Sequence, residues 1–394
     1  MTKLLVPGFK ASAVAAGLKK VKGLDLALIF SEKEAVAAGV FTSNKVKASP
    51  VILSYEHIRD GKIRAIIANS GNANACTGKV GLDNARLTAN SVANELGIRH
   101  DEVVVASTGV IGAHLNMEMI THAIPDLVKK LSPEGIPQAA EAIMTTDSFP
   151  KISRFEGVAG GKTYRIIGIA KGAGMIMPDM ATMLCFILSD ISIDGEDLRK
   201  ALLKSVGTTF NRISVDGDTS TNDMVVVLAN GMAGNGQLSA VDYEGFQEGL
   251  RDVMSDLATM MVRDGEGATK VVYITIKGAK TQLDALTAAK TIANSPLVKT
   301  AFYGQDPNWG RIMAALGRSG IVMKEEDVNI WIDDVGIVEG GLGIGIDAEK
   351  RAAEIMKKKE FNLTIDLHQG SYEDRVTTCD LTHDYISINA DYRT

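Results

Sequence analysis

The segment from Lys171 to Asp190, KGAGMIMPDMATMLCFILSD, constrains the fold more than any other part of the chain. It opens with glycines and a proline, and after residues 180–182 it continues as the apolar run 183–188. This pattern predicts a strained loop that places a hydroxyl residue, Thr182, at the first position of a buried strand. Such a junction holds a side chain rigidly while it leaves one side open. Taken alone, the pattern is also that of an ordinary core strand.

The residues at this junction suggest that the chain cuts its own backbone. Our hypothesis is that the bond between Ala181 and Thr182 is broken, so that Thr182 becomes an N-terminal residue with both a hydroxyl group and a free amine. A threonine hydroxyl does not ionise near neutral pH, but an α-amine with a pKa of about 7.7–8.0 can accept its proton. The two groups together would form an activated nucleophile.

The composition argues against several classes of protein. Of the 394 residues, 45% are hydrophobic and 23% are charged, which is typical of a soluble globular protein with two or three lobes. No run approaches the ~18 apolar residues of a membrane span, so we expect no membrane contact. Pro7, Gly8 and Lys10 interrupt the apolar patch at the N-terminus, which makes it a poor signal peptide. The net charge of −6 argues against a nucleic-acid partner.

The cysteines and histidines indicate neither disulfides nor a metal site. Cys76, Cys185 and Cys379 are widely spaced and fit a reducing cytoplasm, where we expect the protein to be located. The histidines show no metal-ligand spacing. Two apparent motifs also fail. Residues 157–163, GVAGGKT, lack the first glycine of a phosphate-binding loop, and residues 216–223 lack the glycine and the final glutamate of a calcium loop.

The sequence KGAGMIMPDMATML resembles the cleavage segment of the ornithine acetyltransferase family. Members of this family recycle acetyl groups in arginine biosynthesis, and many are also N-acetylglutamate synthases. The family pattern Lys-Gly-x-Gly-Met-Ile-x-Pro-x-Met-Ala-Thr-Met is kept at every fixed position, and a match of this length is specific. The resemblance runs along nearly the whole chain, with further similar segments at residues 39–42, 48–51, 69–78 and 302–311.

Strand-like and helix-like segments alternate on both sides of Thr182. This alternation predicts an α/β or α+β layered protein in which both parts of the chain share one core. Residues 50–54, PVILS, are among the segments that we predict to be strands. The resemblance implies layered β sheets flanked by helices, in a self-cleaving ornithine acetyltransferase fold like that of N-terminal-nucleophile enzymes. It also implies an α chain, 1–181, and a β chain, 182–394, that assemble as a heterotetramer with two copies of each.

A second candidate site element follows the predicted strand 101–106, which ends at Ser107-Thr108-Gly109. A strand that opens onto Thr-Gly can aim one hydroxyl and one backbone N–H at a common point, although the same pattern also fits a plain turn. Such donors can stabilise a developing oxyanion by roughly 2.7–4 kcal/mol each. The resemblance implies that Thr108 and Gly109 form an oxyanion hole.

The resemblance also implies a set of substrate contacts. Either Thr145 or Thr146 belongs to this set, and we favour Thr145. Glu266 stands between two glycines, so it is either a solvated loop carboxylate or a partner for an amine of the substrate. Lys171 would hold a charged substrate group or help to set the pKa of the Thr182 amine. The full set of implied substrate-binding residues is Thr145, Lys171, Thr182, Glu266, Asn389 and Thr394.

The function implied by the resemblance is acetyl transfer by a ping-pong mechanism. N2-acetylornithine binds, Thr182 attacks its acetyl carbonyl, ornithine leaves, and glutamate removes the acetyl group as N-acetylglutamate. Both substrates are amino acids with an α-carboxylate, which explains how one pocket can serve both. No cofactor is needed, and acetyl-CoA is a candidate second donor. The individual roles of residues 210–223, which resemble a segment near the family's active site, do not follow from the sequence.

Two other classes stay open. An N-terminal-nucleophile amidase or aminopeptidase would use water as the acceptor, and it would release free acetate without glutamate. A catalytically silent binding protein would keep the fold, and it would give a single intact band on a denaturing gel.

Overall fold

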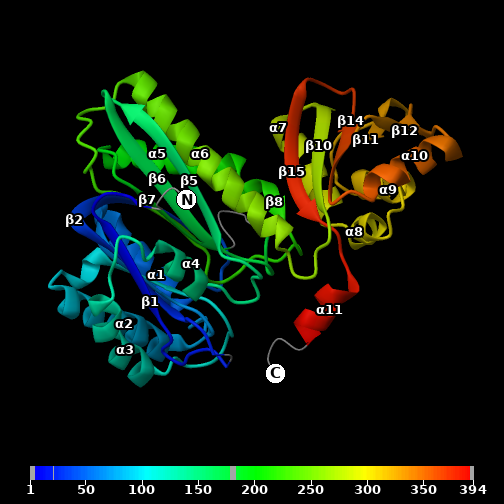
Figure 1. Ribbon diagram of the computed structural model, residues 1–394. Coiled ribbons are helices and arrows are strands. Elements are labelled where there is room, and N and C mark those ends of the chain that lie inside the picture. The colour runs from blue at the N-terminus through cyan, green and yellow to red at the C-terminus, as the bar shows by residue number, and fades with distance from the viewer. Residues whose placement is uncertain (1–4, 21, 178–182, 391–394) are drawn as a thin grey trace. The chain divides into compact units, whose positions relative to one another are not determined.

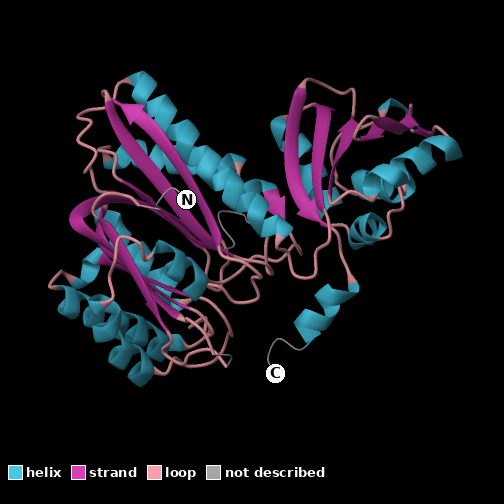
Figure 2. Ribbon diagram, in the orientation of Figure 1, coloured by secondary structure: helices cyan, strands magenta, loops and turns pink. Residues whose placement is uncertain are grey.

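The structure is a computed structural model that describes residues 5–20, 22–177 and 183–390 (Figure 1). The predictions for Ala181, Thr182 and Thr394 therefore lie outside the described residues. The secondary structure along the described residues alternates between helices and strands (Figure 2).

The chain divides into two compact units. Unit 1 consists of Met1–Asn211 and Asp218–Met261, and unit 2 consists of Arg212–Gly217 and Val262–Thr394. The helix α6 (Ala240–Arg263) runs across the boundary between them along the chain.

Unit 1 is built on an eight-stranded sheet of described strands, in the order β4-β3-β2-β9-β7-β6-β5, with β1 paired to β2. The pairs β3–β4 and β7–β9 are parallel and the others are antiparallel. The strands are β1 (Phe9–Val14), β2 (Leu26–Phe41), β3 (Lys62–Asn69), β4 (Val103–Ser107), β5 (Lys151–Ala159), β6 (Lys162–Lys171), β7 (Leu184–Ser189) and β9 (Met224–Ala229).

Helices cover both faces of this sheet. The helix α4 (Ile136–Ala142) packs against β1, β2 and β6, and the helix α5 (Gly195–Thr208) packs against β2. Figure 1 shows α6 alongside β5 and β6, where a Cβ on Gly168 would lie only 2.8 Å from side-chain atoms of Leu257 and Val253. The remaining helical elements of unit 1 are α1 (Ser49–His57), α2 (Gly78–Leu96), α3 (Met117–Lys129), α4 (Ile136–Ala142), α5 (Gly195–Thr208), and the short 3-10 turns η1 (Ile58–Asp60), η2 (His100–Glu102) and η3 (Phe210–Arg212), the last of which ends in unit 2.

The central strands β7 and β9 are buried along their whole length. Because both faces of the sheet are covered, such strands consist of nearly continuous apolar residues rather than an alternating pattern. This explains the apolar run that follows Met183 in the sequence. One core cluster contains Ile167 of β6, Leu184 of β7 and Val226 of β9.

Unit 2 is built on a second sheet, whose described strands follow the order β13-β12-β11-β14-β10-β15-β8. Its core is formed by β10, β14 and β15 against α7, with further contributions from α9 and α10. The strands are β8 (Ile213–Ser214), β10 (Val271–Ala279), β11 (Asn329–Ile332), β12 (Val335–Glu339), β13 (Leu342–Gly343), β14 (Glu360–Asp366) and β15 (Tyr372–Cys379). The helices are α7 (Gln282–Ala293), α8 (Pro296–Tyr303), α9 (Trp309–Gly317), α10 (Ile346–Met356), α11 (His383–Ala390) and the 3-10 turn η4 (Glu325–Asp327).

The prediction of layered β sheets flanked by helices is confirmed. β6 precedes position 182 and β7 follows it, and the two strands pair antiparallel from Ile166↔Ser189 to Lys171↔Leu184. Both parts of the chain therefore contribute strands to one sheet and one core, as the alternating pattern predicts.

The prediction of a strand at residues 50–54 is wrong. These residues lie in α1, whose N-cap is Ala48 and whose first turn contains Pro50. The fixed φ of proline suits the first turn of a helix. Backbone N–H groups in that turn have no intrahelical acceptor, so proline, which lacks this group, loses no hydrogen bond there. The apolar residues Val51 and Leu53 are buried within the helix rather than on a strand.

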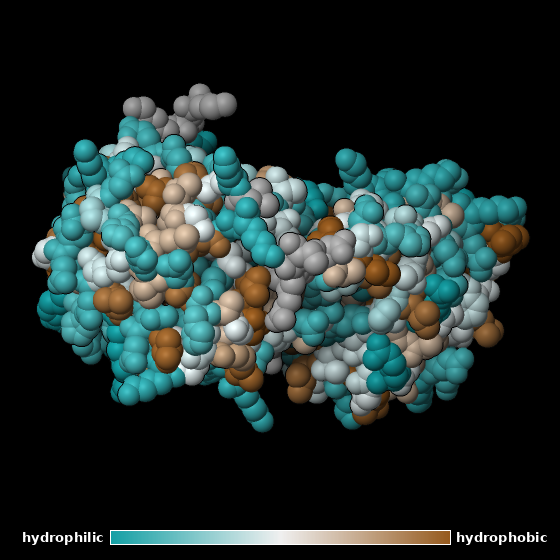
Figure 3. All heavy atoms as spheres, turned by 90° about the horizontal axis from the view of Figure 1, so that it is seen from below, coloured by the Kyte–Doolittle hydropathy of each residue, from teal (hydrophilic) through white to brown (hydrophobic). Residues whose placement is uncertain are grey.

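On the face shown in Figure 3, the apolar residues are scattered among hydrophilic residues and do not form one patch. Examples of exposed apolar residues lie on different elements, such as Val158 on β5, Val241 on α6 and Leu283 on α7. Such scattered residues are normal for a protein surface. In the part of the chain that the structure describes, every helix is too short or too polar to span a bilayer.

Candidate active site

Three of the predicted site residues come together in unit 1. Lys171 is the last residue of β6, and its side chain is largely buried. Its ammonium group donates a hydrogen bond of 2.8 Å to the hydroxyl of Thr145 and one of 3.4 Å to the hydroxyl of Thr108. A strand end, the turn after α4 and the loop after β4 thus converge on one cationic group. Of the two candidate threonines in the 145–146 pair, Thr145 is the one whose hydroxyl accepts from Lys171.

The loop after β4 places Gly109 in a conformation that requires glycine. Its φ is +133°, and a Cβ there would lie 2.3 Å from the carbonyl carbon of Gly71 and 2.5 Å from the nitrogen of Asn72. The N–H of Thr108 is used in a bond of 3.0 Å to the carbonyl of Asn69. Within the described residues, the N–H of Gly109 has no acceptor. The loop therefore presents a hydroxyl and an unused backbone donor, as an oxyanion hole requires.

Asp147 connects this cluster through both of its carboxylate oxygens. Oδ1 accepts hydrogen bonds from the ammonium of Lys151 at 2.7 Å and from the N–H of Gly172 at 2.7 Å. Oδ2 accepts from the N–H of Thr145 at 3.0 Å and lies 3.9 Å from the ammonium nitrogen of Lys171. The side chains of Asp147 and Lys151 are fully buried, with 0% of each exposed.

The charge state of Asp147 follows from its neighbours. Burial acts to raise the pKa of its carboxyl group, but the ammonium groups of Lys171 and Lys151 outweigh this effect and lower the pKa to about 2. Asp147 is therefore an anion between two cations at neutral pH. The cluster carries one net positive charge, and Lys171 directs it toward the hydroxyls of Thr108 and Thr145.

The start of β9 supports the same region. The N–H of Met224 donates to the carbonyl of Met183 at 2.8 Å, which fixes the first described residue after the predicted cleavage site. The side-chain amide of Asn222 donates to the carbonyl of Ala73 at 2.6 Å and to that of Ser107 at 2.8 Å. Asn222 therefore links the start of β9 to the strand end that carries Thr108.

Two further predicted residues come together in unit 2. The side-chain amide of Asn389, on α11, donates a hydrogen bond of 2.7 Å to Oε2 of Glu266. Glu266 is buried, with 8% of its surface exposed, although its position between two glycines also fitted a solvated carboxylate. The adjoining loop is held by Thr382, whose hydroxyl donates to the carbonyl of Gly267 at 2.7 Å.

Three residues of this network were not predicted from the sequence, and these are Asp147, Lys151 and Asn222. A signal for the first two was present, because a carboxylate and a lysine four residues apart flank Pro150 in the segment TTDSFPK. That spacing alone is common on protein surfaces, so it does not reveal a fully buried pair. Asn222 gave no local signal, since its acceptors lie 149 and 115 residues away.

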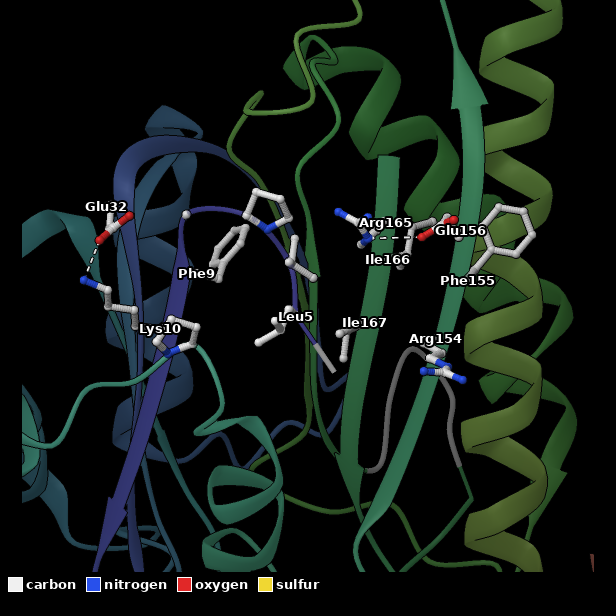
Figure 4. Close-up of a pocket in the computed structure, with 14 residues that line it drawn as sticks. Leu5, Phe9, Lys10, Glu32, Arg154, Phe155, Glu156, Arg165, Ile166 and Ile167 are labelled. Carbon is white, nitrogen blue, oxygen red and sulfur yellow. Dashed lines mark hydrogen bonds and ion pairs between the residues drawn. The ribbon is translucent and has the colours of Figure 1, made fainter. Parts of the chain in front are cut away.

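A separate cavity of about 700 Å³ lies elsewhere in unit 1 (Figure 4). Its lining includes Phe9 and Ile167, and the charged side chains at its edge form the ion pairs Lys10–Glu32 and Arg165–Glu156. None of the described residues that we predicted as site residues lines this cavity. None of the described residues that line this cavity has a hydroxyl or thiol group.

The comparisons with known proteins agree with the resemblance found in the sequence. The model of the ArgJ family matches residues 10–394. The chain is 52% identical over 392 residues to the arginine biosynthesis bifunctional protein ArgJ of Geobacter sulfurreducens, and the match covers 99% of this chain and 100% of that protein. It is 50% identical over 403 residues to the glutamate N-acetyltransferase of Methanocaldococcus jannaschii, with 98% and 97% covered. A crystal structure of arginine biosynthesis bifunctional protein ArgJ from Bacillus halodurans is 42% identical, covers 51% of this chain and 95% of that chain, and has a TM-score of 0.49.

Proposed function

The chain belongs to the ArgJ family, and from this premise we propose that it transfers an acetyl group from N2-acetylornithine to glutamate. The products are ornithine and N-acetylglutamate, and the enzyme acts in arginine biosynthesis. Because relatives that match almost the whole chain are named as bifunctional, we extend the proposal to a second reaction, in which acetyl-CoA donates the acetyl group to glutamate. No cofactor takes part.

The observation that carries the proposal is the joint position of Thr108, Thr145 and Lys171. These residues come from segments far apart in the sequence, and their polar groups meet around one buried ammonium. The cluster lies at the end of β6 that pairs with the start of β7, and β7 begins two residues after the position of Thr182 in the chain. A buried cationic group beside an unused backbone donor suits a reaction in which negative charge develops on an acyl oxygen.

In the proposed mechanism the chain first cuts itself between Ala181 and Thr182. The new α-amine of Thr182 takes the proton of the Thr182 hydroxyl, and the hydroxyl oxygen bonds to the acetyl carbon of N2-acetylornithine. The bond from that carbon to the ornithine nitrogen breaks, and the proton passes to the departing amine. The amine of glutamate then attacks the acetyl-threonine, takes the acetyl group, and returns a proton to the threonine oxygen.

Thr108 and Gly109 stabilise the negatively charged oxygen that forms in both steps. The Thr108 hydroxyl accepts from Lys171 and still has its own proton to donate, while the Gly109 N–H has no acceptor among the described residues. Lys171 carries the positive charge that attracts the α-carboxylate shared by both substrates, or it lowers the pKa of the Thr182 amine. Substrate contacts are further proposed for Thr145, Glu266, Asn389 and Thr394.

The direct test is mass spectrometry of the protein after incubation with N2-acetylornithine. We expect a peptide that begins at Thr182 and carries one acetyl group, and we expect this group to disappear when glutamate is added. The Thr182→Ala variant should form neither the new N-terminus nor the adduct. Turnover without any acetyl group on Thr182 would contradict the mechanism, and acetate released without glutamate would instead indicate an amidase.

The proposal also includes the assembly and location of the protein. The α chain, 1–181, and the β chain, 182–394, would form a heterotetramer with two copies of each, and the cytoplasm would be its compartment. Parallel assays with N2-acetylornithine and with acetyl-CoA as donors distinguish a bifunctional from a monofunctional enzyme. Glutamate acetylation from N2-acetylornithine alone would limit the function to the first reaction.

A further inference from the structure

We infer that Asp147 is a positioning residue for acetyl transfer, and that the buried Lys151, rather than Lys171, is the nearer partner of its carboxylate. This inference rests on the proposed function, because it concerns the same acetyl-transfer site.

The hydrogen bonds of Asp147 support a positioning role. Each oxygen of Asp147 accepts a backbone N–H, one from Gly172 and one from Thr145. These two backbone groups belong to the residue after Lys171 and to the threonine that accepts from Lys171. One carboxylate thus fixes the turn that carries Thr145 relative to the end of β6. Misplacement of reacting groups by about 1 Å can lower a rate by about 100-fold, so a restraint of this kind affects catalysis.

The charges of Lys151 and Lys171 act on Asp147 from different distances. If Asp147 faced Lys171 alone, one carboxylate would neutralise one ammonium, and the pair would attract a substrate carboxylate only weakly. Lys151 changes this balance because its ammonium lies 2.7 Å from Oδ1, nearer than the 3.9 Å between Oδ2 and Lys171. Asp147 is therefore matched mainly by Lys151. Lys171 lies farther from the carboxylate, and its ammonium group donates hydrogen bonds to the hydroxyls of Thr108 and Thr145.

An ion pair with a purely structural role would not need the backbone bonds and the second cation that surround Asp147. A buried ion pair is weak evidence for stability, since apolar side chains of similar size often replace such pairs without loss. Here the carboxylate also organises two backbone groups and one further cation at the candidate active site. Lys19, Glu141 and Asp223 also interact electrostatically with this neighbourhood, and the variants below leave them unchanged.

The test compares two variants of the full chain. Lys151→Met leaves Asp147 to neutralise Lys171, so the cluster loses its net charge while the backbone bonds to Asp147 remain. Asp147→Asn with Lys151→Met removes both charges of the buried pair, so Lys171 again supplies one net positive charge but loses its anchor. We expect Lys151→Met to raise KM for both amino-acid substrates about tenfold with a smaller change in kcat, because the substrate carboxylate is attracted less.

We expect the double variant to melt near the wild-type temperature but to lose about 10- to 100-fold in kcat/KM, with kcat reduced. The matched control is Asp333→Asn with Lys358→Met, which removes an ion pair of 3.1 Å in unit 2 and should leave kcat/KM unchanged. The inference is overturned if the double variant has wild-type kcat/KM, or if activity in both variants falls only in step with the melting temperature.

A second measurement separates this inference from the proposed function. Amide hydrogen exchange of Thr145 and Gly172 reports the two backbone bonds to Asp147 whether or not the protein transfers acetyl groups. We expect at least one of the two amides to exchange faster in the double variant, because asparagine keeps only one acceptor oxygen, and both to exchange at the wild-type rate in the control. If wild-type protein shows no acetyl transfer, the proposed function fails, and unchanged exchange in the double variant would then reject the positioning role independently.

Discussion

At the scale of single residues, Asp223 lies in an environment that disfavours a charge. It is fully buried at the start of β9, and its Oδ2 has no hydrogen-bond partner among the described residues. Burial raises the pKa of its carboxyl group well above the usual value, although hydrogen bonds with Ser220 and Thr42 and the charge of Lys171 act in the opposite direction. Burial therefore favours the neutral form of Asp223, whereas the neighbouring ammonium groups favour the anionic form of Asp147 in the same region.

This difference gives a stability prediction with a defined sign. Below the pKa of an unfolded aspartate, about 3.9, both states of Asp223 are protonated and the group has no effect on stability. As the pH rises above that value, the unfolded chain loses the proton at a lower pH than the folded protein does, so the folded state is progressively destabilised. Asp223→Asn lacks this term. We expect the melting temperature of Asp223→Asn minus that of wild type to be larger at pH 7 than at pH 4. A difference that does not change with pH would contradict this prediction.

Gly109 leads to a second prediction at this scale. In Gly109→Ala, the new Cβ would collide with the backbone of Gly71 and Asn72, so the loop must move and the N–H at position 109 must change direction. Loss of one oxyanion donor lowers kcat by about 100- to 1,000-fold, and we expect an effect of this size in steady-state kinetics. The control is Gly112→Ala, which has a positive φ of +83° but no atom within 4 Å of its Cβ. Equal losses in both variants would indicate backbone strain rather than donor position.

At the scale of elements, the sequence was informative where a pattern is local. The apolar run after Met183 forms β7. Gly172 and Gly174 lie in the described part of the loop before it, which ends at residue 177. The same reasoning failed at residues 50–54, because Pro50 is compatible with both a strand edge and a helix start. Pairs joined across long distances could not be deduced from spacing. Glu266 and Asn389 are 123 residues apart, and Asp147 accepts a hydrogen bond from the N–H of Gly172, which lies 25 residues away.

The link between the start of β9 and the loop after β4 is such a long-range feature, and it can be tested. Asn222→Ala leaves the buried carbonyls of Ala73 and Ser107 without the donors that Asn222 supplies. Each such loss costs about 1–3 kcal/mol, so we expect the free energy of unfolding to fall by about 2–4 kcal/mol in denaturant titrations. Asn90→Ala, at an exposed position of α2, should change it by less than about 0.5 kcal/mol. Similar changes in the free energy of unfolding for both variants would show that the hydrogen bonds of Asn222 do not stabilise the fold.

At the scale of the whole molecule, the strand order determines what self-cleavage would do. In unit 1 the strands β9 and β7, which follow position 182, are inserted between β2 and β6, which precede it. β7 is hydrogen-bonded to β6 along one side, and β9 is hydrogen-bonded to β2 along the other. A β chain that begins at Thr182 could leave the sheet only if both of these strand pairings opened and a shared apolar core became exposed.

We therefore expect the two chains of the cleaved protein to remain together as firmly as one folded chain. Wild-type protein should give two bands on a denaturing gel, yet elute as a single species from a sizing column without denaturant. Thr182→Ala should give one band at 41.9 kDa and elute at the same native volume, since the strand pairing does not depend on the cut. Thr182→Ser keeps the hydroxyl group and should still be cut. An uncut wild-type chain would reject the cleavage hypothesis, whereas chains that separate without denaturant would reject the argument from strand order.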